Sequence, residues 1–239
     1  MIIIPAIDIL GGKAVRLFKG DYDQVKVYSD NPAEFASEWE AQGADCIHLV
    51  DLDAAKEGSL VNLNSIKAIR ETVKCELEYG GGVRSVEDVT QLIEIGINRV
   101  ILGTKALDED FLKELIGRFG GKIAVSVDMD KGFIKTGGWI EDSKVDYLDF
   151  CRSLESLGVE TIVFTDISKD GTLLGPNLEA LNGLLDQTKM KVIQSGGMST
   201  IDDVHALLEI QCTNLYGVII GKALYEKKID LNEAICLTK

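Results

Sequence analysis

Two aspartates that follow apolar runs are the side chains best placed to do chemistry in this sequence. The segments around them, Ile7-Asp8-Ile9 and Val127-Asp128-Met129, are alike and lie 120 positions apart. If both carboxylates face one pocket, one can act as a base and the other as an acid, provided that burial or the neighbouring charge raises the acid's pKa above the usual value of about 4. A structural role, in which each aspartate caps a loop or pairs with a lysine, is the alternative.

Two glycine pairs predict anion sites on either side of these aspartates. Gly81-Gly82 and Gly196-Gly197 are 115 positions apart, and a helix-type pattern follows each pair. Glycine lets the backbone N–H groups approach an anion closely, and the dipole of the following helix adds positive potential. We expect each pair to hold one phosphate together with a second glycine turn, Gly103-Thr104 for the first site and Gly221-Lys222 for the second. The hydroxyl groups of Thr104 and Ser195 can add donors. The alternative is that the glycines only allow tight turns.

Other residues have weaker signals. Arg16 could bind a phosphate or form a salt bridge at the rim, and Thr165, at the end of an apolar run, could orient a substrate or simply pack. Trp139 follows two glycines, so its indole could stack on a flat heterocycle or anchor a lid. Asp170-Gly171 lies in a stretch that predicts a lid loop with Gly171 as its hinge. His48 is interpreted as a core histidine that could face the interior.

The elements that must position these residues alternate between β-type and helical patterns. The apolar β-type runs are Ile2–Ile7, Cys46–Val50, Val73–Tyr79, Arg99–Leu102, Ile123–Val127, Thr161–Thr165, Lys191–Gln194 and Tyr216–Ile220. The helical segments are Pro32–Gln42, Leu63–Thr72, Val86–Ile95, Asp108–Phe119, Val145–Leu157, Asn177–Leu185 and Ile201–Ile210. Alternation of this kind is typical of a parallel sheet covered by helices, and eight units in about 240 residues favour an α/β fold of the closed (β/α)₈ TIM-barrel type. An open doubly wound sheet is the alternative, but the usual G-x-G-x-x-G after the first strand is missing.

The repeat extends beyond the glycines and predicts two fused (β/α)₄ half-barrels, approximately 1–120 and 121–239, in one domain. Leu49-Val50-Asp51-Leu52 resembles Phe164-Thr165-Asp166-Ile167, again 115 positions later. Closure of the halves would set Asp8 opposite Asp128 at the carboxyl ends of the strands, where active sites of such barrels lie. Asp51 and Asp166 have the opposite strand parity and are expected to be structural.

Composition limits the partners. The net charge of −14, without a Lys/Arg-rich segment, argues against nucleic acid or an anionic membrane surface. The five cysteines form no C-x-x-C pair, so reduced thiols in the cytoplasm are expected, with neither disulfides nor a metal site. The apolar start of the chain is too short to span a membrane and has no basic segment before it.

Several blocks of the sequence together resemble the ProFAR isomerase family of histidine biosynthesis over essentially the whole chain. They are Ile4-Pro-Ala-Ile-Asp8, Gly12-Lys-Ala-Val-Arg16, Lys19-Gly-Asp-Tyr22, His48-Leu-Val-Asp-Leu52, Gly80-Gly-Gly-Val-Arg84, Gly138-Trp139, Thr165-Asp-Ile-Ser-Lys-Asp-Gly-Thr172, Ser195-Gly-Gly197 and Gly217-Val-Ile-Ile-Gly-Lys-Ala-Leu224.

The resemblance implies an Amadori rearrangement of an aminoaldose to an aminoketose, without a cofactor, on a small-molecule substrate that carries two phosphates. By position it assigns Asp8 as the general base, Asp128 as the general acid and Thr165 as an aid to positioning. Trp139 would cover the imidazole carboxamide. A monomer is expected.

Three alternatives remain at this point. The cyclase that acts next in the pathway shares the repeat and both aspartates, but its first strand typically reads Pro-Cys-Leu-Asp, where this chain has Pro5-Ala-Ile-Asp8. An isomerase that also serves tryptophan biosynthesis typically has an arginine where this chain has Gly137. A phosphate-binding barrel without catalysis is the third, although two carboxylates in its pocket would repel its ligand.

Overall fold

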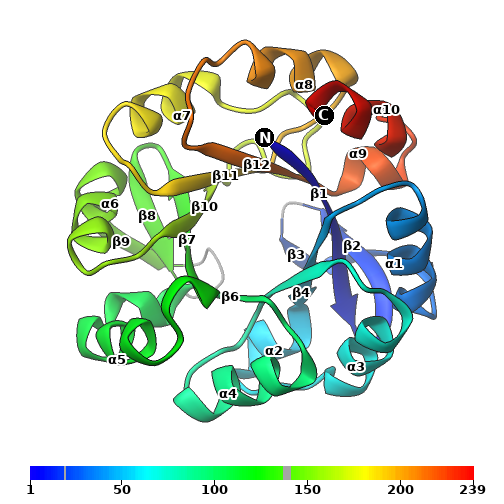
Figure 1. The fold of residues 1–239 in the computed structure, drawn as a ribbon, viewed down its shortest axis with the longest axis horizontal. Coiled ribbons are helices and arrows are strands. Elements are labelled where there is room, and N and C mark those ends of the chain that lie inside the picture. Colours follow the sequence, from blue (N-terminus) through cyan, green and yellow to red (C-terminus); the bar gives the residue numbers. More distant parts are fainter. Residues whose placement is uncertain (19, 137–140) are drawn as a thin grey trace.

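The computed structural model describes residues 1–18, 20–136 and 141–239 (Figure 1). Within these residues, eight parallel strands form a closed ring, and helices surround it. In ring order they are β1 (Ile2–Leu10), β4 (Cys46–Asp51), β5 (Glu76–Gly80), β6 (Arg99–Leu102), β7 (Ile123–Asp130), β10 (Thr161–Asp166), β11 (Lys191–Ser195) and β12 (Leu215–Ile220). Each strand pairs in parallel with the next, and β12 pairs back to β1. The predicted (β/α)₈ barrel is therefore confirmed, and the open sheet is excluded.

The helices follow the barrel strands and cover the outside of the ring. They are α1 (Pro32–Ala41), α2 (Leu52–Glu57), α3 (Leu63–Thr72), α4 (Val86–Ile95), α5 (Glu109–Phe119), α6 (Tyr147–Ser156), α7 (Leu178–Leu185), α8 (Ile201–Leu208), α9 (Lys222–Tyr225) and α10 (Leu231–Thr238), with short 3₁₀ turns η1 (Thr104–Leu107) and η2 (Gly120–Lys122). Among the described residues, none of these helices has the length and apolar character that crossing a membrane requires.

Two apolar layers hold the barrel together. The larger lies between the strands and the helices, because side chains on the outer face of the ring pack against the helices. The smaller fills the inside of the barrel and consists of Ile4, Ala6, Cys46, Ile101, Ala124, Val163, Ile193 and Ile219. These inner side chains fill the middle of the barrel, so a ligand can enter the interior only at the carboxyl ends of the strands.

Two β-hairpins extend the barrel, and the sequence did not predict them. β2 (Lys13–Phe18) and β3 (Asp21–Ser29) follow β1, and β8 (Phe133–Thr136) and β9 (Glu141–Asp146) follow β7. Each of these strands contains charged or polar residues, so none has the continuous apolar run of a strand that is buried on both faces. The hairpins occupy equivalent places in the two halves.

Some predicted boundaries were wrong. The helix expected from Val145 begins at Tyr147, because Asp146 caps it with hydrogen bonds to two backbone N–H groups. The strand expected from Val73 begins at Glu76, since Val73 still belongs to the end of α3, where its N–H donates to the Ile69 carbonyl.

The internal repeat is visible in matching hydrogen bonds. Asp51 accepts a hydrogen bond of 2.7 Å from the Asn62 amide, and Asp166 accepts one of 2.6 Å from the Asn177 amide. Both pairs have the 115-residue offset of the glycine turns. Asp51 and Asp166 thus tie each strand end to the start of the next helix, which is the structural role expected for them.

Candidate active site

A cavity of about 640 Å³ lies at the carboxyl ends of the barrel strands. Its volume is in the range of small-molecule sites. The predicted site residues that line it are Asp8, Arg16, Gly81, Gly82, Gly103, Thr104, Asp128, Thr165, Asp170, Gly171, Ser195, Gly196, Gly197, Gly221 and Lys222. Trp139 lies outside the described residues. The structure therefore brings together every other residue that the sequence singled out for the site.

Asp8 is buried near the end of β1, and the hairpin that follows supplies its partner. The chain reverses at Gly11 and Gly12, both of which have a positive φ, so β2 runs antiparallel to β1. Arg16 on β2 donates from Nη1 to Asp8 Oδ2 at 2.7 Å, and its Nη2 donates to the Ala6 carbonyl, also at 2.7 Å. Of the two roles weighed for Arg16, the salt bridge is therefore formed, and it lies inside the cavity instead of at the rim.

The environment of Asp8 has two opposing effects on the pKa of its carboxyl group. Burial raises the pKa of this carboxyl group above its ordinary value, while the nearby Arg16 and His48 lower it. Arg16 is thus the main group that offsets the cost of keeping a charged Asp8 in the cavity. A carboxylate held in this way can take up a proton.

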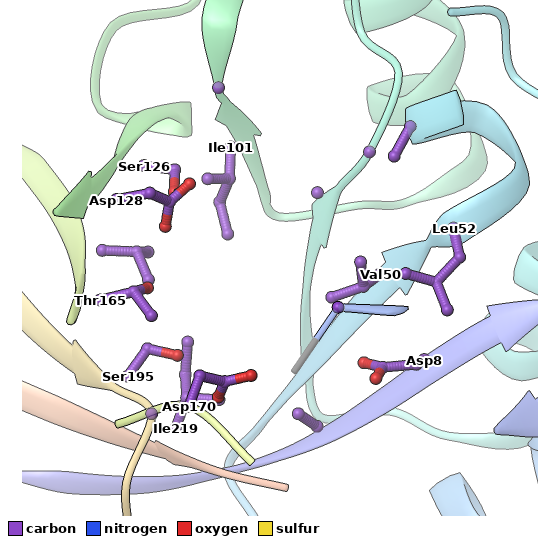
Figure 2. A pocket seen from close by; sticks show the side chains of 18 of the residues that line it. Asp8, Val50, Leu52, Ile101, Ser126, Asp128, Thr165, Asp170, Ser195 and Ile219 are labelled. Carbon is purple, nitrogen blue, oxygen red and sulfur yellow. The ribbon is translucent and has the colours of Figure 1, made fainter. Parts of the chain in front are cut away.

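Asp128 faces the cavity from the other side (Figure 2). The Ser126 hydroxyl, two residues earlier on β7, donates to Asp128 Oδ2 at 2.8 Å. Thr165 on β10 is the register partner of Asp128 and is buried in the same wall. Asp8 and Asp128 therefore lie at the ends of strands on opposite sides of the ring, as the repeat predicted.

Asp170 is a third carboxyl group in the cavity, and its pKa is also raised. It belongs to the segment that follows β10, and burial raises its pKa to about 6; the charges of Asp8 and Asp128 act in the same direction, against Arg16. Such a carboxyl group is partly protonated near neutral pH and can donate a proton. The sequence suggested only binding or a lid for this residue. What it could not show is that three acids converge on one cavity.

The glycine turns on the first side have conformations that only glycine adopts readily. Gly81 and Gly82 have φ values of 121° and 68°, and a Cβ atom on them would come within 2.4 Å and 2.3 Å of the carbonyl oxygens of Asp51 and Ala54. Tight packing alone therefore explains this pair. At Gly103 a Cβ atom would meet nothing within 4 Å, so close packing does not explain that glycine.

The second side repeats the arrangement with one difference. Gly196 and Gly197 have φ values of 82° and 85°, and a Cβ atom on Gly197 would lie 2.5 Å from the Gly175 carbonyl oxygen. A Cβ atom on Gly221 would instead overlap the Arg16 guanidinium, at 1.9 Å from Nη2. Gly221 thus makes room for the arginine that pairs with Asp8. The Lys222 ammonium donates to the Gly171 carbonyl at 2.8 Å and so ties the two loops together.

His48 also lines the cavity, although the sequence ranked it only as a core residue that could face inward. Its Nδ1 lies 2.7 Å from Oε1 of Glu78. The signal that could have found it is strand parity, since His48 and Val50 share one face of β4 and both reach the cavity. Glu78 gave no such signal because it sits in a short, mixed run.

A closed barrel with opposed carboxyl groups at the strand ends, between two matched glycine turns, defines a (β/α)₈-barrel protein with a candidate ligand site at the carboxyl ends of its strands. The family model described as "Histidine biosynthesis protein" matches residues 2–230. The chain belongs to this family.

Curated relatives match nearly the whole chain. Proteins of Synechocystis sp. and Oceanobacillus iheyensis are 49% and 47% identical over 98% of this chain and 92% and 97% of their own lengths, and one of Clostridium acetobutylicum is 44% identical over 99% of this chain and 98% of its own length. All three are named 1-(5-phosphoribosyl)-5-((5-phosphoribosylamino)methylideneamino)imidazole-4-carboxamide isomerase, that is, ProFAR isomerase.

Proposed function

We propose that this protein is a ProFAR isomerase, which converts the aminoaldose ProFAR into an aminoketose by an Amadori rearrangement. The observation that carries the proposal is one cavity with Asp8 on one wall and Asp128 on the other, between two glycine-rich turns. The names of the relatives support the same reaction.

In this mechanism Asp8 is the general base. An acid first protonates the ring oxygen of the ribose, so that the bond from C1 to this oxygen breaks and a cationic imine forms at C1. Asp8 then removes the proton from C2, and the electron pair forms the C1–C2 double bond and neutralises the imine nitrogen. Loss of the C2 hydroxyl proton and gain of a proton at C1 give the ketone. These steps move only protons, so no cofactor is needed.

The acid is Asp128 or Asp170. Asp128 has the position opposite Asp8 and accepts a hydrogen bond from the Ser126 hydroxyl. Asp170 has a pKa raised to about 6, first of all by burial, and so is still partly protonated near neutral pH. The raised pKa is a specific observation in favour of Asp170, and Asp128 then stabilises the cation that forms during ring opening.

The two ends of the substrate fit the two glycine turns. One phosphate would accept hydrogen bonds from the turns at Gly81-Gly82 and Gly103-Thr104, and the other from those at Gly196-Gly197 and Gly221-Lys222. In a chain with a net charge of −14, local backbone N–H groups are the natural source of positive potential. Thr165 and Ser195 supply hydroxyl groups between the two ends, and Trp139 would cover the heterocycle. We expect the enzyme to act as a monomer in the cytoplasm.

An assay of ProFAR and phosphoribosylanthranilate, each with and without ammonia, tests this function. The purified protein should convert ProFAR without ammonia and should have little activity on phosphoribosylanthranilate. Turnover that depends on ammonia would instead indicate the cyclase, and equal rates on both isomerase substrates would indicate the dual-substrate enzyme. Tight binding of ProFAR without turnover would support the alternative of a phosphate-binding barrel without catalysis.

A further inference from the structure

Three charged or titratable side chains lie side by side on adjacent strands of the barrel, and the first of them also lines the cavity. They are His48 on β4, Glu78 on β5 and Arg99 on β6. His48 Nδ1 lies 2.7 Å from Glu78 Oε1, and Arg99 Nη1 donates to Glu78 Oε2 at 2.7 Å. Glu78 has no exposed surface at all, so both of its oxygens depend on these partners.

The second half of the barrel shows that the fold does not need these groups. His48, Glu78 and Arg99 are consecutive register partners across β4, β5 and β6. The equivalent register partners across β10, β11 and β12 are Val163, Ile193 and Gly217. The same strand positions are therefore filled once by a buried charged network and once by uncharged residues.

Burying charges in a barrel is unfavourable unless they are paired well. Burial alone would raise the pKa of Glu78, yet the hydrogen bonds and charges of His48 and Arg99 hold this pKa below its usual value. Glu78 is therefore an ionised acceptor. An ionised acceptor requires a proton on His48 Nδ1, and this hydrogen bond fixes the orientation of the imidazole ring.

The fixed ring lies next to the proposed base. His48 lines the same cavity as Asp8, and it is the register partner of Ala6, two residues before Asp8 on β1. When His48 is protonated, its charge lowers the pKa of Asp8. Asp8 also interacts electrostatically with four other groups among the described residues. They are Arg16 on β2, Tyr22 on β3, Asp170 in the segment after β10 and Tyr225 on α9.

We propose that Glu78 is a positioning residue for the isomerisation: held by Arg99, it locks His48 through Nδ1, so that the opposite edge of the imidazole faces the cavity beside Asp8. This inference rests on the proposed function. The network sits only in the half of the barrel that carries the base, which is why the other half can replace it with apolar side chains.

The first test is Glu78→Gln. The amide keeps the shape but offers only one acceptor to two donors, so His48 should lose its fixed orientation. We expect kcat to fall about 10²-fold, the typical effect of misplacing a group by 1 Å in an active site, with KM changed less than threefold. Ile193→Val is the matched control at the equivalent position of the second half and should leave kcat unchanged. A Glu78→Gln protein with the kcat of the unmodified enzyme would overturn the proposal.

The state of His48 can be observed without any assay of activity. The chain has only two histidines, and the exposed His205 serves as an internal reference in ¹⁵N nuclear magnetic resonance of the rings. We expect a proton on Nδ1 of His48 in the unmodified protein and a mixture of tautomers in Glu78→Gln. An unprotonated Nδ1 in the unmodified protein would refute the positioning role. An inactive unmodified protein with a protonated Nδ1 would instead refute the proposed function.

A combined variant separates positioning from structure. His48→Val, Glu78→Ile and Arg99→Met together replace the network with apolar residues, as the second half does. Apolar replacement of a complete buried network is often neutral or stabilising, so the thermal midpoint should not fall while kcat is lost. Full kcat in this variant would contradict the proposal. If the variant does not fold, the network is structural in this half, and a normal kcat for Glu78→Gln would then exclude positioning.

Discussion

Replacement of Arg16 by glutamine tests how Asp8 is kept ionised. Arg16 makes the closest contact with this carboxylate, at 2.7 Å, and both side chains are largely buried. Glutamine can still donate a hydrogen bond but carries no charge. Without the guanidinium, burial dominates, so the pKa of Asp8 must rise further from its already raised position.

The magnitude follows from the charged contact between Arg16 and Asp8, because glutamine does not replace the charge. A hydrogen bond to a charged group contributes about 1.5–3 kcal/mol. At about 1.4 kcal/mol per factor of ten, kcat/KM should fall about 10- to 100-fold at a pH where Asp8 in the variant is mostly protonated. The base works only when it is ionised, so the acidic limb of the pH profile should move to higher pH. Much of the loss should be recovered in alkaline buffer.

The assay is the pH profile of kcat/KM for the unmodified protein, Arg16→Gln and a control. Arg118→Gln is a suitable control, because Arg118 forms an exposed pair with Glu114 on α5, away from the cavity. Its profile should match that of the unmodified protein. An equal loss at every pH for Arg16→Gln would show that Arg16 acts on the substrate, and no loss would refute its role at Asp8.

Further predictions concern stability and access. The raised pKa of Asp170, about 6, means that the folded state binds its proton more tightly than the unfolded state. The contribution of this proton to stability is therefore present below pH 4 and is lost as pH rises through 6. Asp170→Asn should raise the thermal midpoint at pH 8 and not at pH 4, and an equal effect at both pH values would contradict this. Gly82→Ala puts a methyl group 2.3 Å from a carbonyl oxygen of α2, so it should lower the free energy of unfolding in denaturant by more than about 1 kcal/mol. Gly103→Ala should leave the free energy of unfolding unchanged and weaken the binding of inorganic phosphate. A thiol reagent at pH 8 should label the exposed Cys236 within minutes. It should label Cys151 only on unfolding, because this thiol is buried and its pKa is raised to about 12. The reverse order of labelling in mass spectrometry would be inconsistent with the structure.

The fold and most of the site could be predicted because the repeat carries long-range information. The offsets of 115 positions between the glycine pairs and 120 positions between the aspartates show which strand ends are equivalent, and barrel closure then sets Asp8 opposite Asp128. Local patterns found the barrel strands because most of them are apolar on both faces.

The rest depends on contacts that local patterns do not encode. The salt bridge between Arg16 and Asp8 exists because β2 folds back on β1, and the pattern of one short strand does not show which strand it pairs with. The raised pKa of Asp170 comes first from burial, and then from the charges of Asp8 and Asp128, which are distant in sequence. Glu78 looked like one charge in a mixed run, and only the register with His48 and Arg99 reveals its place inside the barrel.

The most direct test of the account compares binding and turnover in Asp8→Asn. Calorimetry should give an affinity for ProFAR within a few-fold of that of the unmodified protein, because the glycine turns are intact, while turnover should fall by at least about 10²-fold, the lower range for loss of a general base. Turnover near the unmodified rate would contradict the claim that Asp8 removes the C2 proton between two bound phosphates.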